Sequence, residues 1–586
     1  MIKNLDFRNI NTLWSSIIAE TLSNLGLKTA IICPGSRSTP LTVAFANHPK
    51  IETIPILDER SASFFALGIA KRSRLPVVLI CTSGTAGANF YPAVIEARES
   101  KTALIILTAD RPPELRDCHA GQAIDQVKLY GSYCNWYTEL SLPLIEIKLL
   151  SYLRQTIISS WNKSFLPNKG VVHINCPFRE PLAPFTQPEI ELLSFKKYFK
   201  DFFLDINEDS RVSSSNYCKF DIFNYLNKWR SIKKGIIIAG VNNSTNPSLY
   251  CKNIAFISRF LNYPILAEAL SPLRNFANKN PNLINTYDVI LCNPKLKESL
   301  KPDIVIQFGQ FPTSKRLRKW LEQTQARYWL IDSSSDNFDP LHNHSFSIYS
   351  SVENLDLRNI KNTMSTKSNS EYLKRWKIIN DNVNKNIQST FTGIDLMLQA
   401  KLPFILSTIL PLQTNIFIAN SMSVRYAESF WFPNNKELIP YFNRGANGIE
   451  GTLSSALGMA QNSSNNILVT GDLALLHDTN GFLVSKKFKG HLTIILINNN
   501  GGGIFEMLPI SKDKLLFEDY FATPQNIDFA KLCNTYDIQH INIQDWRHLQ
   551  ELLNPLPTFG VRVLELTIKR EEDASWFQNN ISKFTD

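Results

Sequence analysis

The sequence contains no apolar run that approaches the ~18 residues of a membrane-spanning helix. It also lacks a long basic run and any nucleic-acid-binding motif, so the formal net charge of +10 does not by itself indicate a nucleic-acid partner. The nine cysteines are odd in number and are not spaced as in a metal finger, which favours reduced thiols. The first residues have neither an apolar core nor a small-residue cleavage site. We therefore expect a cytoplasmic protein, or a protein of the plastid stroma if the chain is plastid-encoded.

The residues that are present indicate a large globular protein. Hydrophobic residues make up 44% of the chain and charged residues 19%, a balance that excludes wholesale disorder. A chain of 586 residues is too long for one hydrophobic core. The usual domain size predicts about three or four domains.

Helical and strand patterns alternate along the chain. The stretch near 11–25 has the apolar spacing of an amphipathic helix, and short apolar runs bounded by turn residues predict strands. The predicted strands are residues 29–33, 54–57, 77–82, 103–108, 171–175, 235–240, 304–309, 328–332, 416–420, 467–471, 492–498 and 561–567. This alternation is typical of α/β domains built on doubly wound parallel sheets.

Two polar stretches interrupt the alternation and are interpreted as linkers, at residues 186–215 and 351–372. They divide the chain into three predicted α/β domains, residues 1–185, 216–350 and 373–586. The sequence has no short-period repeat, although the first and last domains could be related folds.

An aspartate and an asparagine follow two of the predicted strands. Asp472 comes after strand 467–471 and Asn499 after strand 492–498, with 26 residues between them. A crossover through a helix near 480–488 would place both at carboxyl strand ends, where open α/β sheets bind ligands. One carboxylate, one amide oxygen and a loop carbonyl suit an octahedral Mg²⁺ that keeps a diphosphate as its remaining partner. The alternative is a purely structural turn.

Glu59 follows a short predicted strand and opens a predicted helix. A carboxylate at this position is commonly a cap or a partner of the helix dipole. Beside a magnesium diphosphate site, the same carboxylate would instead be a candidate cofactor ligand.

These features together resemble the thiamine-diphosphate-dependent enzymes. Asp472 and Asn499 match the metal motif of that superfamily, and Glu59 matches its glutamate that faces the aminopyrimidine. Five further segments resemble one family within it, the 2-succinyl-5-enolpyruvyl-6-hydroxy-3-cyclohexene-1-carboxylate synthases of menaquinone and phylloquinone synthesis. The segments are 34–41 (PGSRSTPL), 108–117 (TADRPPELRD), 122–126 (QAIDQ), 420–425 (NSMSVR) and 443–451 (NRGANGIEG).

The resemblance implies a pyrimidine-binding, a central and a diphosphate-binding domain, in that order. It implies a transferase that decarboxylates 2-oxoglutarate on thiamine diphosphate and adds the resulting succinyl carbanion to isochorismate by conjugate addition. The expected partners are these two small molecules and a second copy of the chain, without nucleic acid or membrane. A homodimer or a dimer of dimers is implied because Glu59 and Asp472 typically meet across a subunit interface in these enzymes.

The resemblance also assigns the cofactor site. A hydrogen bond from Glu59 to the pyrimidine would favour the imino tautomer, whose nitrogen removes the thiazolium C2 proton, so Glu59 is the expected catalytic residue. Mg²⁺ or Mn²⁺ would be bound by Asp472, Asn499 and the carbonyl of Gly501. The expected cofactor-binding residues are Glu59, Asp472, Asn499, Gly501, Ile504 and Phe505.

Both implied substrates are dicarboxylates, for which arginine is suited because its donors pair bidentately with a carboxylate. The expected substrate-binding residues are Ser36, Arg37, Arg111, Gln122, Lys315, Arg316, Ser421, Arg425 and Arg444. Ser421 and Arg425 lean toward the succinyl carboxylate. The residues that lean toward isochorismate are Arg37, Arg111, Gln122, Lys315 and Arg316.

The sequence departs from the family pattern at a few positions. His119 and Gly121 stand in a segment of the expected substrate pocket where Gly and Asn are common, and Glu450 stands where Asp is frequent. Two alternatives remain open. Another thiamine-diphosphate carboligase, such as an acetohydroxyacid-synthase-like enzyme, would have no evident need for so many cationic positions. A non-catalytic member of the fold is disfavoured by the intact Glu59 and metal positions.

Overall fold

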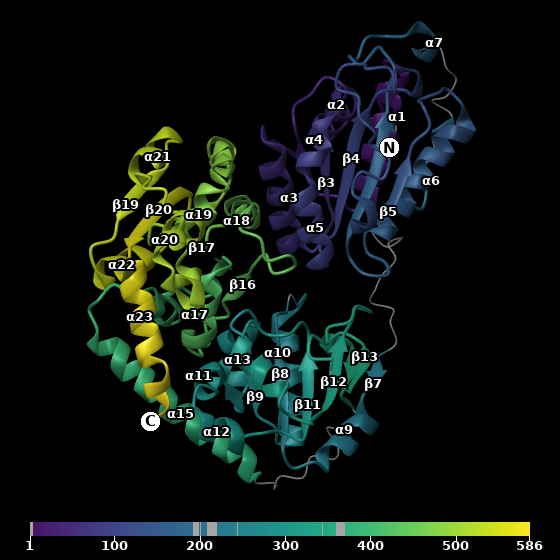
Figure 1. Ribbon diagram of the computed structural model, residues 1–586. Coiled ribbons are helices and arrows are strands. Elements are labelled where there is room, and N and C mark those ends of the chain that lie inside the picture. Colours follow the sequence, from purple (N-terminus) through teal and green to yellow (C-terminus); the bar gives the residue numbers. More distant parts are fainter. Residues whose placement is uncertain are drawn as a thin grey trace. The chain divides into compact units, whose positions relative to one another are not determined.

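The computed structural model describes residues 4–191, 198–199, 201–207, 219–242, 244–342, 344–358 and 370–586. It contains three six-stranded sheets whose strands are all parallel (Figure 1). The expected α/β architecture of three doubly wound parallel sheets is confirmed. Among the described residues, no helix combines the length and apolar character needed to cross a membrane.

The first sheet has the strand order β2-β1-β3-β4-β6-β5. Its central strands are buried along their whole length, as expected for a parallel sheet with helices on both faces. The strands are β1 (Thr29–Ile32), β2 (Glu52–Pro55), β3 (Val77–Cys81), β4 (Leu104–Asp110), β5 (Cys134–Glu139) and β6 (Val171–Pro177). The helices are α1 (Ile10–Asn24), α2 (Thr39–Ala46), α3 (Glu59–Ser73), α4 (Thr85–Asn89), α5 (Tyr91–Glu99), α6 (Ile147–Lys163) and α7 (Pro188–Glu191).

The middle sheet has the order β10-β9-β8-β11-β12-β13, the order of a Rossmann-type sheet. Its strands are β8 (Gly235–Ala239), β9 (Ile265–Ala267), β10 (Leu283–Ile284), β11 (Ile304–Phe308), β12 (Arg327–Asp332) and β13 (Ser345–Tyr349). Its helices are α9 (Phe223–Arg230), α10 (Pro247–Leu261), α11 (Tyr287–Ile290), α12 (Pro294–Ser299) and α13 (Lys315–Leu321). Two short strands, β7 (Phe220–Asp221) and β14 (Leu355–Asp356), pair beside it.

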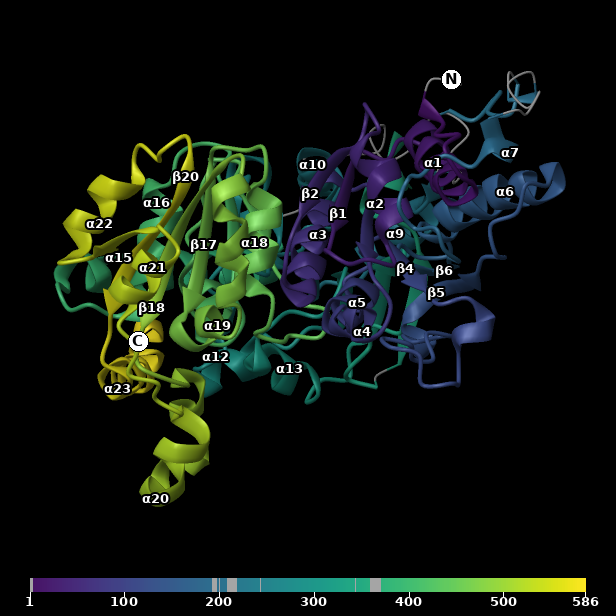
Figure 2. The ribbon, with the colours of Figure 1, turned by 90° about the horizontal axis from the view of Figure 1, so that it is seen from above.

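The third sheet has the order β16-β15-β17-β18-β20-β19, which repeats the connection order of the first sheet. Its strands are β15 (Asn415–Ile418), β16 (Ile439–Tyr441), β17 (Asn466–Gly471), β18 (His491–Asn498), β19 (Gln539–Asn542) and β20 (Gly560–Thr567). The helices of this part of the chain are α15 (Glu371–Gly393), α16 (Leu402–Ile409), α17 (Met422–Phe430), α18 (Thr452–Ala460), α19 (Asp472–Leu476), α20 (Lys514–Phe517), α21 (Phe529–Thr535), α22 (Trp546–Leu553) and α23 (Arg570–Asn580). Figure 2 shows α20 on a segment that extends away from this sheet.

One expected helix has a different form. The segment predicted as a helix near 480–488 is a 3₁₀ helix, η10 (Thr479–Lys487). Asn480 and Gly481 are poor α-helix formers, which accounts for the tighter geometry. Gly481 also lies close to α18, where an added Cβ would come within 2.8 Å of Ser454 Oγ.

The chain forms two compact units. The first comprises the described parts of 1–216 together with 443–462 and 477–490, and the second comprises the remaining described residues. Helix α18 therefore belongs to the first unit and packs against α3, although the two helices are far apart in the sequence.

The packing of α3 against α18 depends on glycine. A Cβ at Gly68 would lie 2.0 Å from the carbonyl oxygen of Ser455, and a Cβ at Gly458 would lie 2.0 Å from that of Phe65. The two backbones approach so closely that no side chain fits at either position. This contact fixes the helix whose first residue is Glu59.

Candidate functional site

The proposed metal ligands lie at the ends of two adjacent strands. Strands β17 and β18 pair in register, with Gly471 opposite Ile497, so Asp472 and Asn499 follow neighbouring strand ends. Asp472 is the first residue of α19, and its Oδ1 accepts a hydrogen bond of 2.8 Å from the N–H of Leu473. Its Oδ2 accepts another, also of 2.8 Å, from the N–H of Gly501. The spacing in the sequence thus correctly predicted that these two residues follow neighbouring strands.

These oxygens have the properties of cation ligands. Asp472 is only 4% exposed, and burial raises the pKa of its carboxyl to about 6, against the opposing effect of its backbone hydrogen bonds. Asn499 Oδ1 is buried and has no hydrogen-bond partner within the described part of the chain. A buried carboxylate beside an unsatisfied amide oxygen fits a hard divalent cation, which would satisfy both.

The glycine loop after β18 is held close to its neighbours. Gly501 has a φ of +137°, and an added Cβ would lie 2.3 Å from the carbonyl oxygen of Ala522. The N–H of Gly502 donates to that same oxygen at 2.7 Å. Arg570, which the sequence patterns did not single out, donates to the carbonyl of Asn500 at 3.0 Å and holds the loop from α23. No signal in the spacing of the motif points to that arginine.

Ile504 and Phe505 lie on the 3₁₀ helix η11 (Gly503–Met507), and both are half-buried. Phe505 meets Phe521 edge to face, with ring centroids 5.7 Å apart. Ile504 packs against the core cluster that includes Phe577. Both side chains thus have apolar packing partners at the end of the glycine loop.

Glu59 is the first residue of α3, but it is not the cap of that helix. Asp58 is the N-cap, and its side chain accepts a hydrogen bond of 3.0 Å from the N–H of Ser61. The interpretation of Glu59 as the cap of this helix is therefore excluded. Burial raises the pKa of Glu59 above its ordinary value, and the charge of Asp58 adds to the rise.

The start of α3 is fixed by the segment that follows α19. Asp478 accepts hydrogen bonds from the N–H of Ser454 at 2.7 Å and from its hydroxyl at 3.0 Å. Asn480 donates to Asp58 at 2.7 Å, and Arg60 donates to the carbonyl of His477 at 2.8 Å. Burial raises the pKa of Asp478 to about 6.

Two arginines of the predicted substrate site lie close together in the first unit. Arg111 follows β4 and donates to the hydroxyl of Ser83 and, at 2.5 Å, to the carbonyl of Gly121. Arg37 follows β1 and donates to the carbonyl of Phe178 at 3.1 Å. Burial lowers the pKa of Arg37, and the charge of Arg111 lowers it further. Two neighbouring guanidinium groups favour an anion between or beside them.

The other predicted residues of the first unit vary in exposure. Ser36 and Gln122 are exposed, and Arg444 is half-buried. Gln122 has a φ of +55° and follows Gly121 directly, so the backbone turns sharply beside the Arg111 contact. An added Cβ at Gly121 meets no atom within 4 Å, which shows that this departure from the family pattern leaves open space.

The predicted residues of the second unit lie on α13 and α17. Lys315 is exposed at the start of α13, whereas Arg316 is half-buried and pairs with Asp288 at 2.7 Å. Asp288 also accepts a hydrogen bond of 2.8 Å from Ser429 of α17. Asp288 therefore joins the two helices that carry the predicted residues. Sequence patterns did not identify this aspartate.

Ser421 and Arg425 occupy the first turn of α17. Ser421 has a φ of +64° and its carbonyl accepts a hydrogen bond of 2.6 Å from Arg425 Nη1. This contact holds the guanidinium over the start of the helix, close to the end of β15.

Comparison with known proteins places the chain among relatives of known name. The descriptions of three matching family models are "Thiamine pyrophosphate enzyme, N-terminal TPP binding domain" (residues 14–129), "Middle domain of thiamine pyrophosphate" (214–418) and "Thiamine pyrophosphate enzyme, C-terminal TPP binding domain" (420–559). The crystal structure of benzoylformate decarboxylase from Polynucleobacter necessarius superposes with a TM-score of 0.66 and 14% identity, and the match covers 95% of this chain and 99% of that one. At this identity the likeness concerns the fold alone.

Curated relatives are much closer in sequence. Proteins named 2-succinyl-5-enolpyruvyl-6-hydroxy-3-cyclohexene-1-carboxylate synthase are 62% identical in Crocosphaera subtropica and 60% identical in Gloeothece citriformis, each over 99% of both chains. The protein of that name from Trichodesmium erythraeum is 54% identical over the full length of both. The chain belongs to the thiamine pyrophosphate enzymes and, within them, to the family of 2-succinyl-5-enolpyruvyl-6-hydroxy-3-cyclohexene-1-carboxylate synthases.

Proposed function

We propose that this chain decarboxylates 2-oxoglutarate with thiamine diphosphate and adds the succinyl unit to isochorismate, which gives 2-succinyl-5-enolpyruvyl-6-hydroxy-3-cyclohexene-1-carboxylate. The observation that carries the proposal is the full-length identity of 54 to 62% to relatives that bear the name of this synthase. The reaction places the chain in menaquinone or phylloquinone synthesis.

Thiamine diphosphate, when bound, supplies the carbon nucleophile that attacks a 2-oxo acid and holds the electron pair left by departing CO₂. Its diphosphate would be held through a Mg²⁺ or Mn²⁺ ion by Asp472, Asn499 and the carbonyl of Gly501. The buried carboxylate of Asp472 and the unsatisfied Oδ1 of Asn499 support this ligand set. Ile504 and Phe505 would supply apolar contact to the organic part of the cofactor.

Glu59 is the proposed catalytic residue. Its carboxyl would exchange a proton with a ring nitrogen of the pyrimidine, a task for which a raised pKa is suitable. Asp58 takes over the capping of α3, so Glu59 is not needed for that purpose.

The cationic residues would hold the carboxylates of the two substrates. Arg37, Arg111, Gln122, Lys315 and Arg316 are assigned to isochorismate, and Ser421 and Arg425 to the succinyl carboxylate. Ser36 and Arg444 are further proposed contacts. Arg316 donates from Nη1 to Asp288, so it would bind a substrate carboxylate through its other guanidinium N–H groups.

The proposal includes a homodimer or a dimer of dimers, since in this superfamily the counterparts of Glu59 and Asp472 typically meet across a subunit interface. It also includes the domain boundaries 1–185, 216–350 and 373–586, with linkers between them. A cytoplasmic or stromal location is supported by the described cysteines, all of which are free thiols.

The test is a comparison of substrates with purified protein, thiamine diphosphate and Mg²⁺. We expect CO₂ release from 2-oxoglutarate to be coupled to consumption of isochorismate, and pyruvate to be a poor donor. Turnover of pyruvate pairs without any reaction of isochorismate would overturn the assignment and favour an acetohydroxyacid-synthase-like enzyme. Absence of turnover with every pair would favour a non-catalytic member of the fold.

A further inference from the structure

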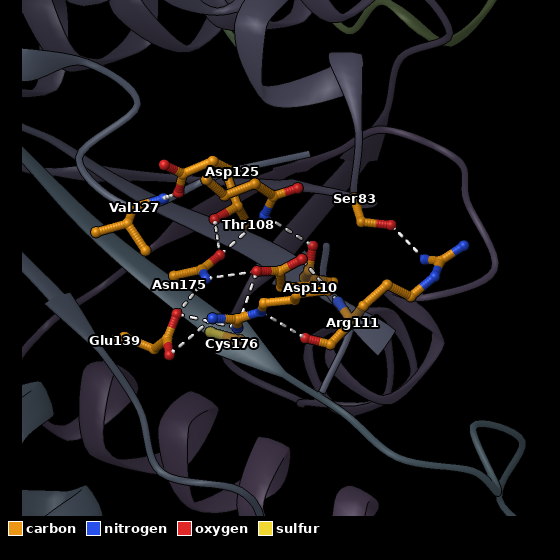
Figure 3. Close-up of polar contacts among 12 residues, drawn as sticks. Ser83, Thr108, Asp110, Arg111, Asp125, Val127, Glu139, Asn175 and Cys176 are labelled. Atoms are coloured by element: carbon orange, nitrogen blue, oxygen red, sulfur yellow. Dashed lines mark hydrogen bonds and ion pairs between the residues drawn. The ribbon is translucent and has the colours of Figure 1, made fainter. Parts of the chain in front are cut away.

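A largely buried polar cluster lies beside Arg111, at the carboxyl ends of β4 and β6 (Figure 3). Asn175 is its centre: its Nδ2 donates to Asp110 Oδ2 and to Glu139 Oε2, at 2.8 Å each. Its Oδ1 accepts a hydrogen bond of 2.9 Å from the hydroxyl of Thr108. Arg116 lies 3.0 Å from both carboxylates. The two carboxylates of the cluster are therefore stabilised by the positive charge of one guanidinium and by two hydrogen bonds from one amide.

Gln126 connects this cluster to two loops. Its Nε2 donates to Asn175 Oδ1 at 2.8 Å and to the carbonyl of Ala109 at 3.2 Å. Its Oε1 accepts a hydrogen bond of 2.9 Å from the N–H of Gly84. Gln126 is only 2% exposed, so these bonds are shielded from water. A neutral amide is suited to this position because it offers two donors and an acceptor without charge.

The loops that Gln126 joins are those that hold the guanidinium of Arg111. Figure 3 shows this guanidinium turned toward Ser83, away from the cluster. Ser83 precedes Gly84, whose N–H is bound by Gln126. The second acceptor of Arg111 is the carbonyl of Gly121, five residues before Gln126 on the same loop. Both acceptors of Arg111 are thus fixed relative to β4 through one side chain.

We propose that Gln126 is a positioning residue that sets the orientation of Arg111, and with it the recognition of the carboxylates of isochorismate. The backbone of Arg111 is held by groups other than Gln126. Its N–H donates to Asp110 Oδ1 at 2.7 Å, and its carbonyl accepts from Arg116 at 3.2 Å. Gln126 therefore controls the far end of the side chain, where a substrate is bound. This inference rests on the proposed function.

The loop that Gln126 closes also carries Gln122, whose exposed side chain is the other predicted isochorismate contact of this loop. A Cβ at Gly84 would lie 3.3 Å from the carbonyl oxygen of Gln122, so the two loops touch at that point. Loosening of Gln126 would displace Gln122 together with the acceptors of Arg111. The hydrogen bonds of Gln126 go to Asn175, Ala109 and Gly84. None of these three is a proposed cofactor ligand, so the affinity for thiamine diphosphate should not change.

The test is steady-state kinetics of Gln126→Met, which keeps the length of the side chain and removes the amide. We expect the KM for isochorismate to rise about tenfold, the size expected if Arg111 loses one well-formed hydrogen bond to the substrate. The KM for 2-oxoglutarate and the Kd of thiamine diphosphate should stay within about twofold. The matched control is Gln461→Leu, which removes another buried glutamine of the first unit, one that accepts from the N–H of Lys489 at 3.2 Å.

A double-mutant cycle separates positioning from general weakening of the fold. If Gln126 acts through Arg111, Gln126→Met should have little further effect on the KM for isochorismate in the Arg111→Lys background. Should Gln126→Met not accumulate as folded protein, Gln126→Asn keeps a neutral amide on a shorter side chain, and the same split between the two KM values is expected at smaller size.

Provided that the wild-type enzyme uses isochorismate, two results for Gln126→Met would overturn the inference. One is an unchanged KM for isochorismate, and the other is an equal change in the KM values for isochorismate and 2-oxoglutarate. Additive effects of Arg111→Lys and Gln126→Met would overturn it as well. Failure of the wild-type enzyme to consume isochorismate would instead refute the proposed function.

Discussion

The N–H of Gly501 donates a hydrogen bond of 2.8 Å to Asp472 Oδ2, which joins the glycine loop to the carboxylate at the end of the neighbouring strand. Asn499 Oδ1 has no such partner in the described part of the chain. Strand register and one backbone donor thus bring together the residues of the proposed cation site, which follow two neighbouring strands.

Asn499→Ala should weaken the Mg²⁺-dependent binding of thiamine diphosphate by at least about tenfold, because it removes one oxygen ligand. Titration calorimetry at fixed Mg²⁺ measures the change. The control is Asn498→Ala, since Asn498 donates instead to Glu565 at 2.6 Å. Equal affinities for the two variants would show that Asn499 is not a ligand.

Glu59→Gln should lower turnover by about 10² to 10⁴-fold, the usual contribution of a proton-transfer group, while cofactor affinity changes little. The substitution keeps the shape of the side chain but removes its acidic proton. Asp58→Asn is the matched control, because asparagine also caps a helix well and should preserve turnover. Near-normal turnover of Glu59→Gln would remove Glu59 from catalysis.

Asp478→Asn should stabilise the protein at pH 8 relative to the wild type. The folded-state pKa of Asp478 is about 6, above the ordinary 3.8, so the wild type gains stability from this group below about pH 4 and loses it as the pH rises through 6. The loss is on the order of 3 kcal/mol at most. An asparagine amide can still accept from the N–H of Ser454 and meet its hydroxyl.

Thermal unfolding of the cofactor-free protein at pH 5 and pH 8 measures this effect. The advantage of Asp478→Asn should shrink as the pH is lowered. A constant difference between variant and wild type at both pH values would contradict the assigned pKa.

Gly68→Ala should destabilise the protein by about 1–3 kcal/mol, because the added methyl would force α3 and α18 apart. Gly393→Ala at the end of α15 is the control, since nothing lies within 4 Å of its added Cβ. Both variants are compared by thermal denaturation. Similar midpoints for the two would show that the helices do not need the close approach at Gly68.

Much of the fold follows from local patterns in the sequence. The central strands β3, β4 and β18 each contain a continuous apolar run, as expected where helices cover both faces of a parallel sheet. Edge strands carry weaker signals. Every residue of β5 is half-buried and the strand includes polar residues, so its sequence lacks a continuous apolar run and was not predicted.

The placement of the candidate metal ligands at strand ends was predictable, because a single motif contains both residues and the spacing between them. The spacing of Asp472 and Asn499 implies neighbouring strand ends, and the structure has them there. Interactions between distant segments left no such signal. Asp288 lies 28 residues before Arg316 and 141 before Ser429, yet it binds both, and no periodicity connects these positions.

The mass of the product formed from unlabelled isochorismate and 2-oxoglutarate labelled with ¹³C in every carbon shows directly whether the chain joins the two substrates. Loss of one labelled carbon as CO₂ and transfer of the remaining four predict an adduct heavier than the unlabelled product by four mass units. Detection of labelled CO₂ without that adduct, with isochorismate recovered intact, would contradict the central claim that this chain joins the two substrates.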